Sequence, residues 1–231
     1  MGGDNPPDEI IAGVVKAAEF YNDLELILVG KDDIIDKKLK KMDIHNNSIK
    51  IKNASQKIEM NEKPGTALKR KKDSSINVGT KMVKNQKADA FISPGNTGAV
   101  MGAGIFNIGR IPGIKRPSIA AVFPSKSGET LVLDAGANVD SKPINLVQFA
   151  VMGQIYSENV LGINNPRIGL LNIGEEKSKG NKLSSETYDL LETDNKINNF
   201  IGNIEGRDIF DDTCDIVVCD GFMGNIVLKT T

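Results

Sequence analysis

The stretch LVLDAGAN at residues 131–138 is a short apolar run that ends at Asp134 and continues into a glycine turn. A short apolar run bounded by a turn is typical of a strand buried within a sheet. Three further stretches repeat this design, with Asn, Asp or Glu in the turn: ADAFISPGNTG at 88–98, RIGLLNIGEEKSKGN at 167–181 and DIVVCDGFMGN at 215–225. A helix is expected after each turn, so the sequence predicts an α/β protein with a parallel sheet.

The first part of the chain continues this alternation. Asn5-Pro6-Pro7 is expected to open a helix, whose apolar face would contain Ile10, Ile11, Val14, Val15 and Ala18. The other expected elements are strands at 24–30 and 49–52, a charged helix at 32–42, and a helix that is capped within 73–75 and runs to about residue 86.

The composition narrows the possible functions. The 231 residues include 29 basic and 30 acidic side chains, and aromatic residues make up 5%, so nucleic acid is not indicated as a partner. No apolar segment is long enough to span a membrane and no signal peptide is recognisable, so we expect a soluble or peripherally membrane-associated protein. Cys214 and Cys219 lie in one apolar run without other ligands nearby, which predicts core packing in a reducing cytoplasm and no metal site.

The polar turns are candidates for one shared site, because ligands of open α/β sheets bind outside the carboxyl ends of the strands. The turn formed by Gly95, Asn96, Thr97 and Gly98 could bind an anion through backbone N–H groups at a helix start. It could equally be a plain turn in which Asn96 caps the helix. It matches neither the dinucleotide fingerprint nor the Walker A loop, so nucleotide binding is not indicated.

The turn after residue 173 combines both signs of charge. Glu175, Glu176, Lys179 and Asn181 form either a substrate loop, in which Lys179 meets phosphate, or an ion-paired surface loop. Two adjacent carboxylates rarely converge on one cation without further ligands, so a metal is the weaker interpretation.

Two aspartates end predicted strands and are each followed by an asparagine. Asp134 with Asn138, and Asp220 with Asn225, could bind substrate or could hold the N–H groups of their own turns. Lys142 places a cation near the start of the helix after the first of these turns.

A run of four cations precedes the predicted cap at 73–75. Lys69, Arg70, Lys71 and Lys72 could form a solvated helix end, or they could recruit phosphate or an acidic protein partner.

His45 is the single histidine and is expected in an exposed loop. The Ser-His-Asp and Cys-His designs are therefore excluded in practice. A reaction of this chain should need no imidazole base. Inorganic phosphate suits that condition, because it is an anion near neutral pH and can attack without losing a proton to the protein.

At these turns the sequence resembles the acyl-ACP:phosphate acyltransferases of phospholipid synthesis, the PlsX family. The resemblance is carried in order and spacing by these stretches: MGGDNPP, RKKDSSI, ADAFISPGNTGAVM, LDAGANVDSKPINLVQFAVMG, NPRIGLLNIGEEKSKGN, FIGNIEGRDIF and DIVVCDGFMGNIVLKT. It implies a Rossmann-like three-layer αβα sandwich related to isocitrate dehydrogenases and phosphotransacetylases, formed as a homodimer. It also implies acyl transfer from acyl carrier protein to phosphate without an organic cofactor, and the acyl phosphate would then feed a membrane acyltransferase.

By match of motif, the resemblance implies a site made of the polar turn residues. The residues expected in catalysis are Asn96, Asn138, Lys179 and Asn181. Those expected to bind substrate or phosphate are Gly95, Thr97, Gly98, Arg70, Lys71, Lys72, Asp134, Lys142, Glu175, Asp220 and Asn225. In this hypothesis the backbone at 96–98 and Lys179 or Lys72 hold phosphate, while Asn138 or Asn181 donates to the carbonyl oxyanion.

The chain also departs from the family pattern. Relatives are expected to begin with a strand ahead of the MGGD turn and to continue for about a further third of their length, through helices used for dimerisation and membrane contact. We therefore expect one domain over residues 1–231 without those parts. Asn53 stands where relatives often have His. The alternatives are a phosphotransacetylase for short acyl-CoA, an inactive fragment that only binds acyl carrier protein, and lastly a dehydrogenase of the related fold.

Overall fold

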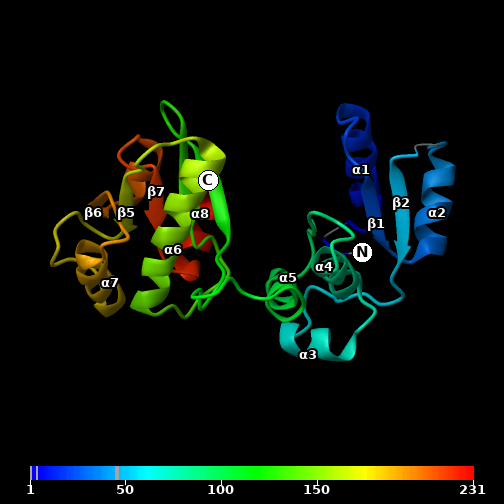
Figure 1. The fold of residues 1–231 in the computed structure, drawn as a ribbon, viewed down its shortest axis with the longest axis horizontal. Coiled ribbons are helices and arrows are strands. Elements are labelled where there is room, and N and C mark those ends of the chain that lie inside the picture. Colours follow the sequence, from blue (N-terminus) through cyan, green and yellow to red (C-terminus); the bar gives the residue numbers. More distant parts are fainter. Residues whose placement is uncertain (1, 4, 45–46) are drawn as a thin grey trace. The chain divides into compact units, whose positions relative to one another are not determined.

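The computed structural model describes residues 2–3, 5–44 and 47–231, so the expectation for His45 lies outside the described residues. The chain divides into two compact units, Met1–Arg110 and Ile111–Thr231, and each is described by itself (Figure 1). The interpretation as one domain stays a prediction.

Unit 1 begins with helices and strands where the sequence predicts them. Its elements are α1 (Asp8–Phe20), β1 (Leu26–Gly30), α2 (Asp32–Lys41), β2 (Ile49–Asn53), α3 (Pro64–Arg70), α4 (Ser75–Lys84), α5 (Thr97–Ala103) and a π-helical turn (Gly104–Ile108).

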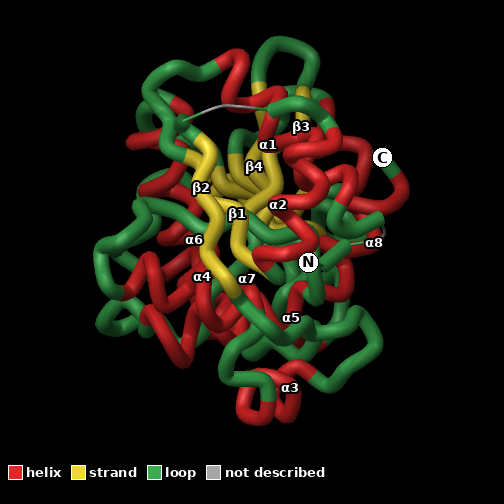
Figure 2. Tube along the Cα trace, turned by 90° about the vertical axis from the view of Figure 1, so that its right-hand side faces the viewer, coloured by secondary structure: helices red, strands yellow, loops and turns green. Residues whose placement is uncertain are grey.

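The first core of unit 1 joins α1 and α2 to a small parallel sheet. β1 and β2 pair in parallel and lie side by side (Figure 2). Ile11 and Val15 of α1 pack with Leu28 of β1 and Ile35 of α2. The predicted apolar face of the first helix is therefore confirmed, since the residues at three- and four-residue spacing meet the same strand.

A second core lies between α3, α4 and α5. Ala67 and Leu68 of α3 pack with Ile76 of α4 and Ala99 of α5. The hydroxyl of Ser74 accepts a hydrogen bond from the third backbone N–H that follows it, at 3.4 Å, and so caps α4. The predicted cap within 73–75 is confirmed.

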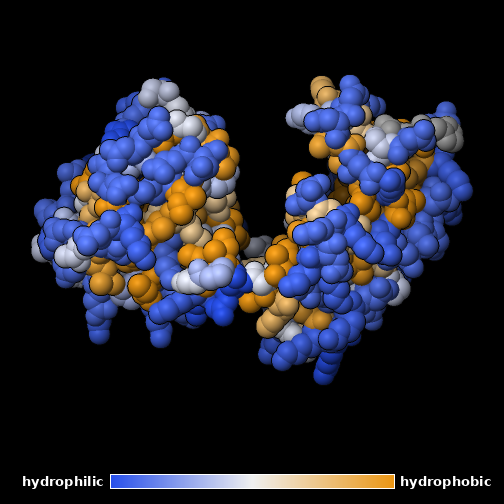
Figure 3. Space-filling model, viewed as in Figure 1, coloured by the Kyte–Doolittle hydropathy of each residue, from blue (hydrophilic) through white to orange (hydrophobic). Residues whose placement is uncertain are grey.

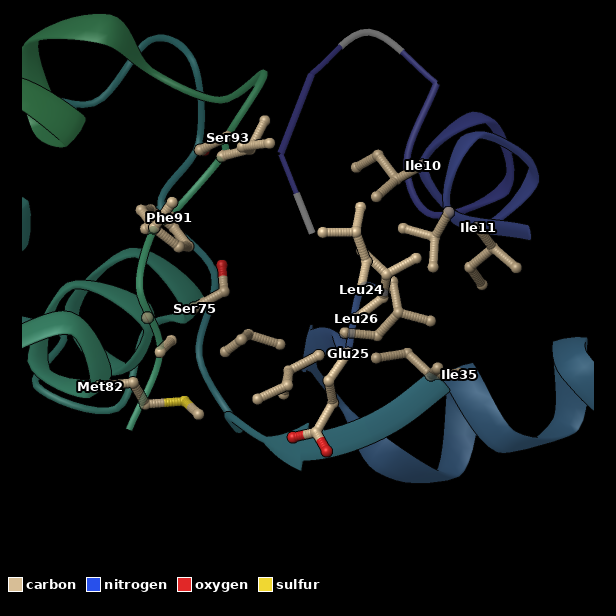
Figure 4. A pocket seen from close by; sticks show the side chains of 18 of the residues that line it. Ile10, Ile11, Leu24, Glu25, Leu26, Ile35, Ser75, Met82, Phe91 and Ser93 are labelled. Carbon is tan, nitrogen blue, oxygen red and sulfur yellow. The ribbon is translucent and has the colours of Figure 1, made fainter. Parts of the chain in front are cut away.

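The predicted strand at 88–93 is wrong, because these residues form neither strand nor helix. They line a cavity of about 530 Å³ together with β1 and α1. Figure 4 shows Phe91 and Ser93 on one side of this cavity and Leu24 and Leu26 on the other. None of these residues is buried, and Ile92 is 91% exposed. Among the described residues it has no neighbouring strand to pair with, and a strand requires such a partner.

Unit 2 contains the larger sheet. Its elements are β3 (Ala120–Pro124), β4 (Glu129–Leu133), α6 (Pro143–Tyr156), a π-helical turn (Ser157–Leu161), β5 (Ile168–Leu171), α7 (Lys182–Thr193), β6 (Phe200–Ile204), a 3₁₀ turn (Gly206–Phe210), β7 (Ile216–Val218) and α8 (Gly221–Thr230). The strand order is β3-β4-β7-β5-β6. β3 is antiparallel to β4, and the other three neighbouring pairs are parallel. The predicted α/β class with a mostly parallel sheet is confirmed.

Alternate residues of the central strands face two separate cores. On one side Leu131 and Ile216 pack with Phe149 of α6 and Leu191 of α7. On the other side of the sheet, the core includes Cys214, and residues of α8 and of the 3₁₀ turn pack against it. Helices therefore cover both faces of the sheet, which gives unit 2 three layers. The outward face of α7 is hydrophilic (Figure 3).

Among the described residues, we find no helix whose length and apolar character would allow it to cross a membrane.

Candidate functional site

Three of the four predicted turns meet at one edge of the sheet in unit 2. β7 lies between β4 and β5 and is parallel to both, so the carboxyl ends of these three strands are neighbours. The turns at 134–138 and 172–181 follow β4 and β5, whereas after β7 the predicted turn at 221–225 is already the first part of α8. The turn at 95–98 belongs to unit 1.

Asp134 holds the first of these turns together. Its side chain is fully buried. Oδ1 accepts from the backbone N–H groups of Ile119 at 2.9 Å and Ala137 at 3.1 Å. Oδ2 accepts from the backbone N–H and the Nδ2 of Asn138, at 2.6 and 2.8 Å. These four bonds occupy the carboxylate, so the structural interpretation of Asp134 is favoured over substrate binding.

The side chain of Asn138 also forms hydrogen bonds that hold this turn. Its Nδ2 donates to the carbonyl of Pro117 and to Asp134, both at 2.8 Å, and the residue is buried. A side-chain amide has two N–H groups, and both are used. The predicted donation from Asn138 to an oxyanion would require one of these hydrogen bonds to break, and it stays a prediction.

The turn after β7 packs directly against this first turn. The N–H of Gly221 donates to the carbonyl of Asn138 at 2.9 Å. A Cβ on Gly136, whose φ is +129°, would lie 3.3 Å from the side chain of Asn225. Asp220 caps α8, since Oδ1 accepts from the two N–H groups of residues 222 and 223, at 2.8 and 3.0 Å. The amide of Asn225 has no hydrogen bond to the described part of the chain, so it can bind a ligand.

Lys142 begins α6 and is exposed. Its backbone N–H donates to Oδ1 of Asn145 at 3.0 Å, which fixes the start of the helix. Its ammonium makes no ion pair with any described residue, as expected of a group that is free to bind an anion.

The turn after β5 contains two lysines with different surroundings. Lys177 pairs with Asp189 at 3.1 Å and with Glu192 at 2.6 Å, and its Nζ lies 4.8 Å from the ring centre of Tyr188. Lys179 is exposed and makes no ion pair within the described ranges. The ammonium of Lys179 is therefore the available cation of this turn.

Asn181 follows Lys179 by two positions and is the N-cap residue of α7. Its Oδ1 accepts from the backbone N–H of Ser184 at 3.0 Å and so caps α7. Its Nδ2 has no partner among the described residues. Glu175 lies 3.7 Å from Arg207, a loose and exposed ion pair. No group of three or more potential metal ligands occurs in the described residues, Glu175 and Glu176 included.

In unit 1, Asn96 serves as the cap that one interpretation of the sequence gave it. Its Oδ1 accepts from the N–H of Ala99 at 3.0 Å. Its Nδ2 donates to the carbonyls of Met60 at 3.0 Å and Glu62 at 3.1 Å. The side chain is buried and holds the segment near 60 against α5, so the structure does not support Asn96 as a catalytic group.

The neighbours of Asn96 differ in their accessibility. Gly95 is buried against Gly2, and a Cβ added to Gly98 would lie 2.7 Å from Pro64. Thr97 is exposed at the start of α5. The backbone at Thr97 is therefore the accessible part of this turn.

The run of four cations is divided by its contacts. Nζ of Lys71 donates to Glu62 and to the carbonyl of Lys57, both at 2.6 Å, so phosphate would compete with these two contacts and its binding by Lys71 stays a prediction. The hydrogen bond from Lys71 lowers the pKa of the Glu62 carboxyl. Arg70 and Lys72 are exposed and unpaired with respect to the described chain.

The thiols are unsuited to nucleophilic chemistry. Cys214 and Cys219 are free and buried. Burial raises the pKa of the Cys214 thiol to about 12 and also raises that of Cys219. Both thiols are therefore protonated near neutral pH, and their expected role as core residues is confirmed.

Sequence reasoning missed Asn172 and Asn203. Asn172 directly follows β5, and Asn203 lies within β6. Each donates a side-chain hydrogen bond to a carbonyl of the turn that carries Lys179. A polar residue at the end of an apolar strand was the available signal.

Comparison with solved structures defines the class of protein as an α/β fold of the phosphotransacetylase type. EutD phosphotransacetylase from Staphylococcus aureus aligns with a TM-score of 0.67 at 15% identity, over 96% of this chain and 78% of that one. A phosphotransacetylase from Streptococcus pyogenes aligns with a TM-score of 0.70 at 18% identity, over the same shares of the two chains. These identities establish the fold alone.

The sequence then places the chain within a family. The model of the fatty acid synthesis protein family matches residues 1–231, and the chain belongs to this family. A protein of Halothermothrix orenii named phosphate acyltransferase is 60% identical over 231 residues, which are all of this chain and 69% of the relative. One of Thermoanaerobacterium thermosaccharolyticum with the same name is 49% identical over 230 residues, 100% of this chain and 67% of the relative. The chain thus spans about two thirds of the length of these relatives.

Proposed function

We propose that this protein transfers a fatty acyl group from acyl carrier protein to inorganic phosphate, and that the acyl phosphate serves phospholipid synthesis. The family and the phosphate acyltransferase relatives support this reaction class. The structural observation that carries the proposal is that Lys179, exposed and without an ion pair among the described residues, and Asn181, with its Nδ2 unoccupied, both lie just before α7.

The start of α7 is suited to an anion for three reasons. Lys179 offers an ammonium without an ion pair among the described residues, and Asn181 offers an unoccupied Nδ2. The first turn of a helix of 12 residues adds backbone N–H groups and the positive end of the helix dipole. A phosphate at this place would meet one charge and several N–H donors.

The described residues favour direct attack over an acyl-enzyme intermediate. Both cysteines are buried and protonated, so no thiolate is at hand among the described residues. In the proposed step a phosphate oxygen forms a bond to the thioester carbonyl carbon, and the carbon–sulfur bond breaks. The phosphopantetheine sulfur leaves as a thiolate, which is a good leaving group because the pKa of an ordinary thiol is about 8.5.

Positioning and charge stabilisation then remain for the protein to supply. We assign Lys179 to phosphate and Nδ2 of Asn181 to the carbonyl oxygen as it becomes an oxyanion. Lys142 directly precedes α6 and Asn225 lies in the first part of α8, and both are assigned to further substrate oxygens. In unit 1, the backbone N–H groups at Thr97 are assigned to substrate binding.

Arg70 and Lys72 are assigned to the carrier protein or to phosphate, because both are exposed and neither has a partner in the described structure, which is also true of Lys69. We further propose that the protein works in the cytoplasm as a homodimer, with peripheral membrane contact where the acyl phosphate is consumed. These three features come from the family resemblance.

The test is to incubate the purified chain with long-chain acyl carrier protein and phosphate, and to follow acyl phosphate and free carrier protein. Release of both products that depends on phosphate supports the proposal. Preference for a short acyl-CoA in direct competition would instead favour a phosphotransacetylase. Tight binding of acyl carrier protein by a folded sample without turnover would identify a binding fragment.

A further inference from the structure

The loop that carries Lys179 and Asn181 is fixed by two asparagine amides outside the predicted site. Nδ2 of Asn172 donates to the carbonyl of Lys179 at 3.1 Å. Nδ2 of Asn203 donates to the carbonyl of Glu176 at 3.0 Å. The loop side chains from 175 to 181 are exposed, so few packing contacts fix its course. The two amides therefore contribute most of the specific contacts from the sheet.

The two hydrogen bonds act on the same short segment. The carbonyl of Glu176 accepts a second hydrogen bond from the backbone N–H of Lys179, at 3.0 Å. The backbone N–H of Asn172 donates to the carbonyl of Ile204 at 2.8 Å and joins the end of β5 to β6. Asn203 thus holds the carbonyl that receives the N–H of Lys179, while Asn172 holds the carbonyl of Lys179 itself.

The surroundings of Asn203 indicate that its amide is needed for the loop. The residue is 6% exposed, and its buried Oδ1 has no partner in the described part of the chain. Burying an unpaired carbonyl oxygen is unfavourable, and an apolar side chain here would avoid that cost. The amide of Asn203 therefore lowers the stability of the fold through its unpaired oxygen, while its nitrogen binds the carbonyl of Glu176.

Gly180 makes room for the second amide. Its φ is +95°, and a Cβ at this position would lie 2.3 Å from Oδ1 of Asn172. Glycine is the residue that combines this backbone conformation with so close an approach. The absence of a side chain at Gly180 therefore leaves the space in which the amide of Asn172 reaches the carbonyl of Lys179.

We propose that Asn172 and Asn203 are positioning residues, which fix the 172–181 loop so that the Lys179 ammonium and the Asn181 amide act on one substrate. This inference rests on the proposed function of Lys179 and deepens it. Without an amide, the loop would spend part of its time in other conformations. Phosphate would then bind more weakly, in proportion to the lost population, while saturating phosphate would restore the binding conformation.

The test compares Asn203→Asp and Asn172→Asp with the wild-type chain. Each change keeps the size of the side chain and removes the N–H donor. Asn199→Asp is the matched control, since Nδ2 of Asn199 donates to the carbonyl of Asn165 at 3.1 Å just before β6 begins. We expect the KM for phosphate to rise about two- to twelvefold in the first two variants, the range that corresponds to one lost hydrogen bond. The kcat should change by less than about twofold, and the control should match the wild type.

Amide hydrogen exchange provides a readout that needs no turnover. The N–H of Lys179 should exchange faster in both test variants, while β5 and β7 keep wild-type rates. An unchanged KM and an unchanged rate at Lys179 would overturn the inference. Equal acceleration throughout the sheet would overturn it too, because the amides would then serve only the stability of the fold.

Failure of the proposed function can be recognised separately. If the wild-type chain forms no acyl phosphate, the proposed reaction fails, and exchange at Lys179 still decides whether the two amides fix the loop. If Asn203→Asp does not fold, Asn172→Asp supplies both readouts, because Asn172 is only partly buried.

Discussion

Lys177 and Lys179 are two positions apart and have the same charge, but their contacts differ. The ammonium of Lys177 contacts two carboxylates and a tyrosine ring, whereas Lys179 makes no ion pair in the described structure. A bound anion would compete with the partners of Lys177 but not with any partner of Lys179. The difference allows a direct comparison of two neighbouring substitutions.

Lys179→Ala should raise the KM for phosphate about tenfold to a hundredfold, because a hydrogen bond to a charged group contributes roughly 1.5–3 kcal/mol. Lys177→Ala is the control and should leave this KM near the wild-type value. Initial rates of acyl phosphate formation over a range of phosphate concentrations would measure both. Equal KM values in Lys179→Ala and the wild type would refute the assignment of Lys179.

Asp134 and Asp220 occur in the same sequence pattern, at the end of a strand, but have different structural roles. Asp134→Asn should destabilise the fold by about 1–3 kcal/mol, because an amide nitrogen would replace an acceptor of two hydrogen bonds. Asp220→Asn should cost less than about 0.5 kcal/mol, because asparagine caps a helix about as well as aspartate. Urea unfolding of both variants would check this, and equal losses would contradict it.

The sequence could predict that the strand-ending aspartates matter but could not separate their roles. The carboxylate of Asp134 accepts from the N–H of Ile119, and the amide of Asn138 donates to the carbonyl of Pro117. Both partners lie in the segment that leads into β3. The sequence analysis did not predict β3. Asn203 escaped notice for the same reason, since it contacts a carbonyl 27 residues away, whereas the contact of Asn172 is local, seven residues along the chain.

At the scale of elements, α8 approaches the turn after β4 through a glycine. A Cβ on Gly224 would lie 1.9 Å from the carbonyl oxygen of Asp134. The glycine turns that the sequence analysis took as signs of a binding site are thus also contact points between elements.

Gly224→Ala should lower the free energy of unfolding by about 1–3 kcal/mol, because the methyl group forces a backbone shift. Gly13→Ala in α1 is the control. A Cβ there meets nothing within 4 Å, so alanine should stabilise the helix by about 0.5–1 kcal/mol. Thermal or urea unfolding would measure both, and a neutral Gly224→Ala would show that α8 can move away from the turn.

The elements predicted well were those with a local signal, such as α1 with its apolar face and α4 with its Ser74 cap. The run at 88–93 has an equally clear apolar signal but lies along a cavity, and a strand exists only beside a partner. β6 went unrecognised because Gly202 and Asn203 interrupt its apolar pattern. The alternation of strands and helices was sufficient for the fold class, because it depends on the order of elements and not on any single one.

At the scale of the whole molecule, each unit contains carboxylates with lowered pKa values. In unit 1 a hydrogen bond from Ser55 lowers the pKa of Asp73. In unit 2 burial raises the pKa of Asp215, but hydrogen bonds and charge from Arg167 outweigh this effect and lower the pKa below its ordinary value. Such groups stabilise the fold above their unfolded-state pKa, and this contribution is lost as the pH falls through the lower, folded-state value.

Asp215→Asn should therefore make unit 2 less sensitive to acid. The wild type should lose more stability than the variant when the pH falls from 7 to 3, because only the wild type must protonate this carboxylate. Asp140→Asn, at an exposed position whose carboxylate makes no ion pair with the described residues, is the control. Urea unfolding at the two pH values would test this, and parallel losses in wild type and Asp215→Asn would refute it.

The two buried thiols have a practical consequence. The sequence contains two cysteines, and both lie in unit 2, where they are 1% and 3% exposed. An alkylating reagent can reach them only when the sheet separates from α8 and the 3₁₀ turn, since their protonated and covered state blocks reaction. The rate of thiol labelling therefore measures how often unit 2 opens, and unit 1, which contains no cysteine, does not contribute to this rate.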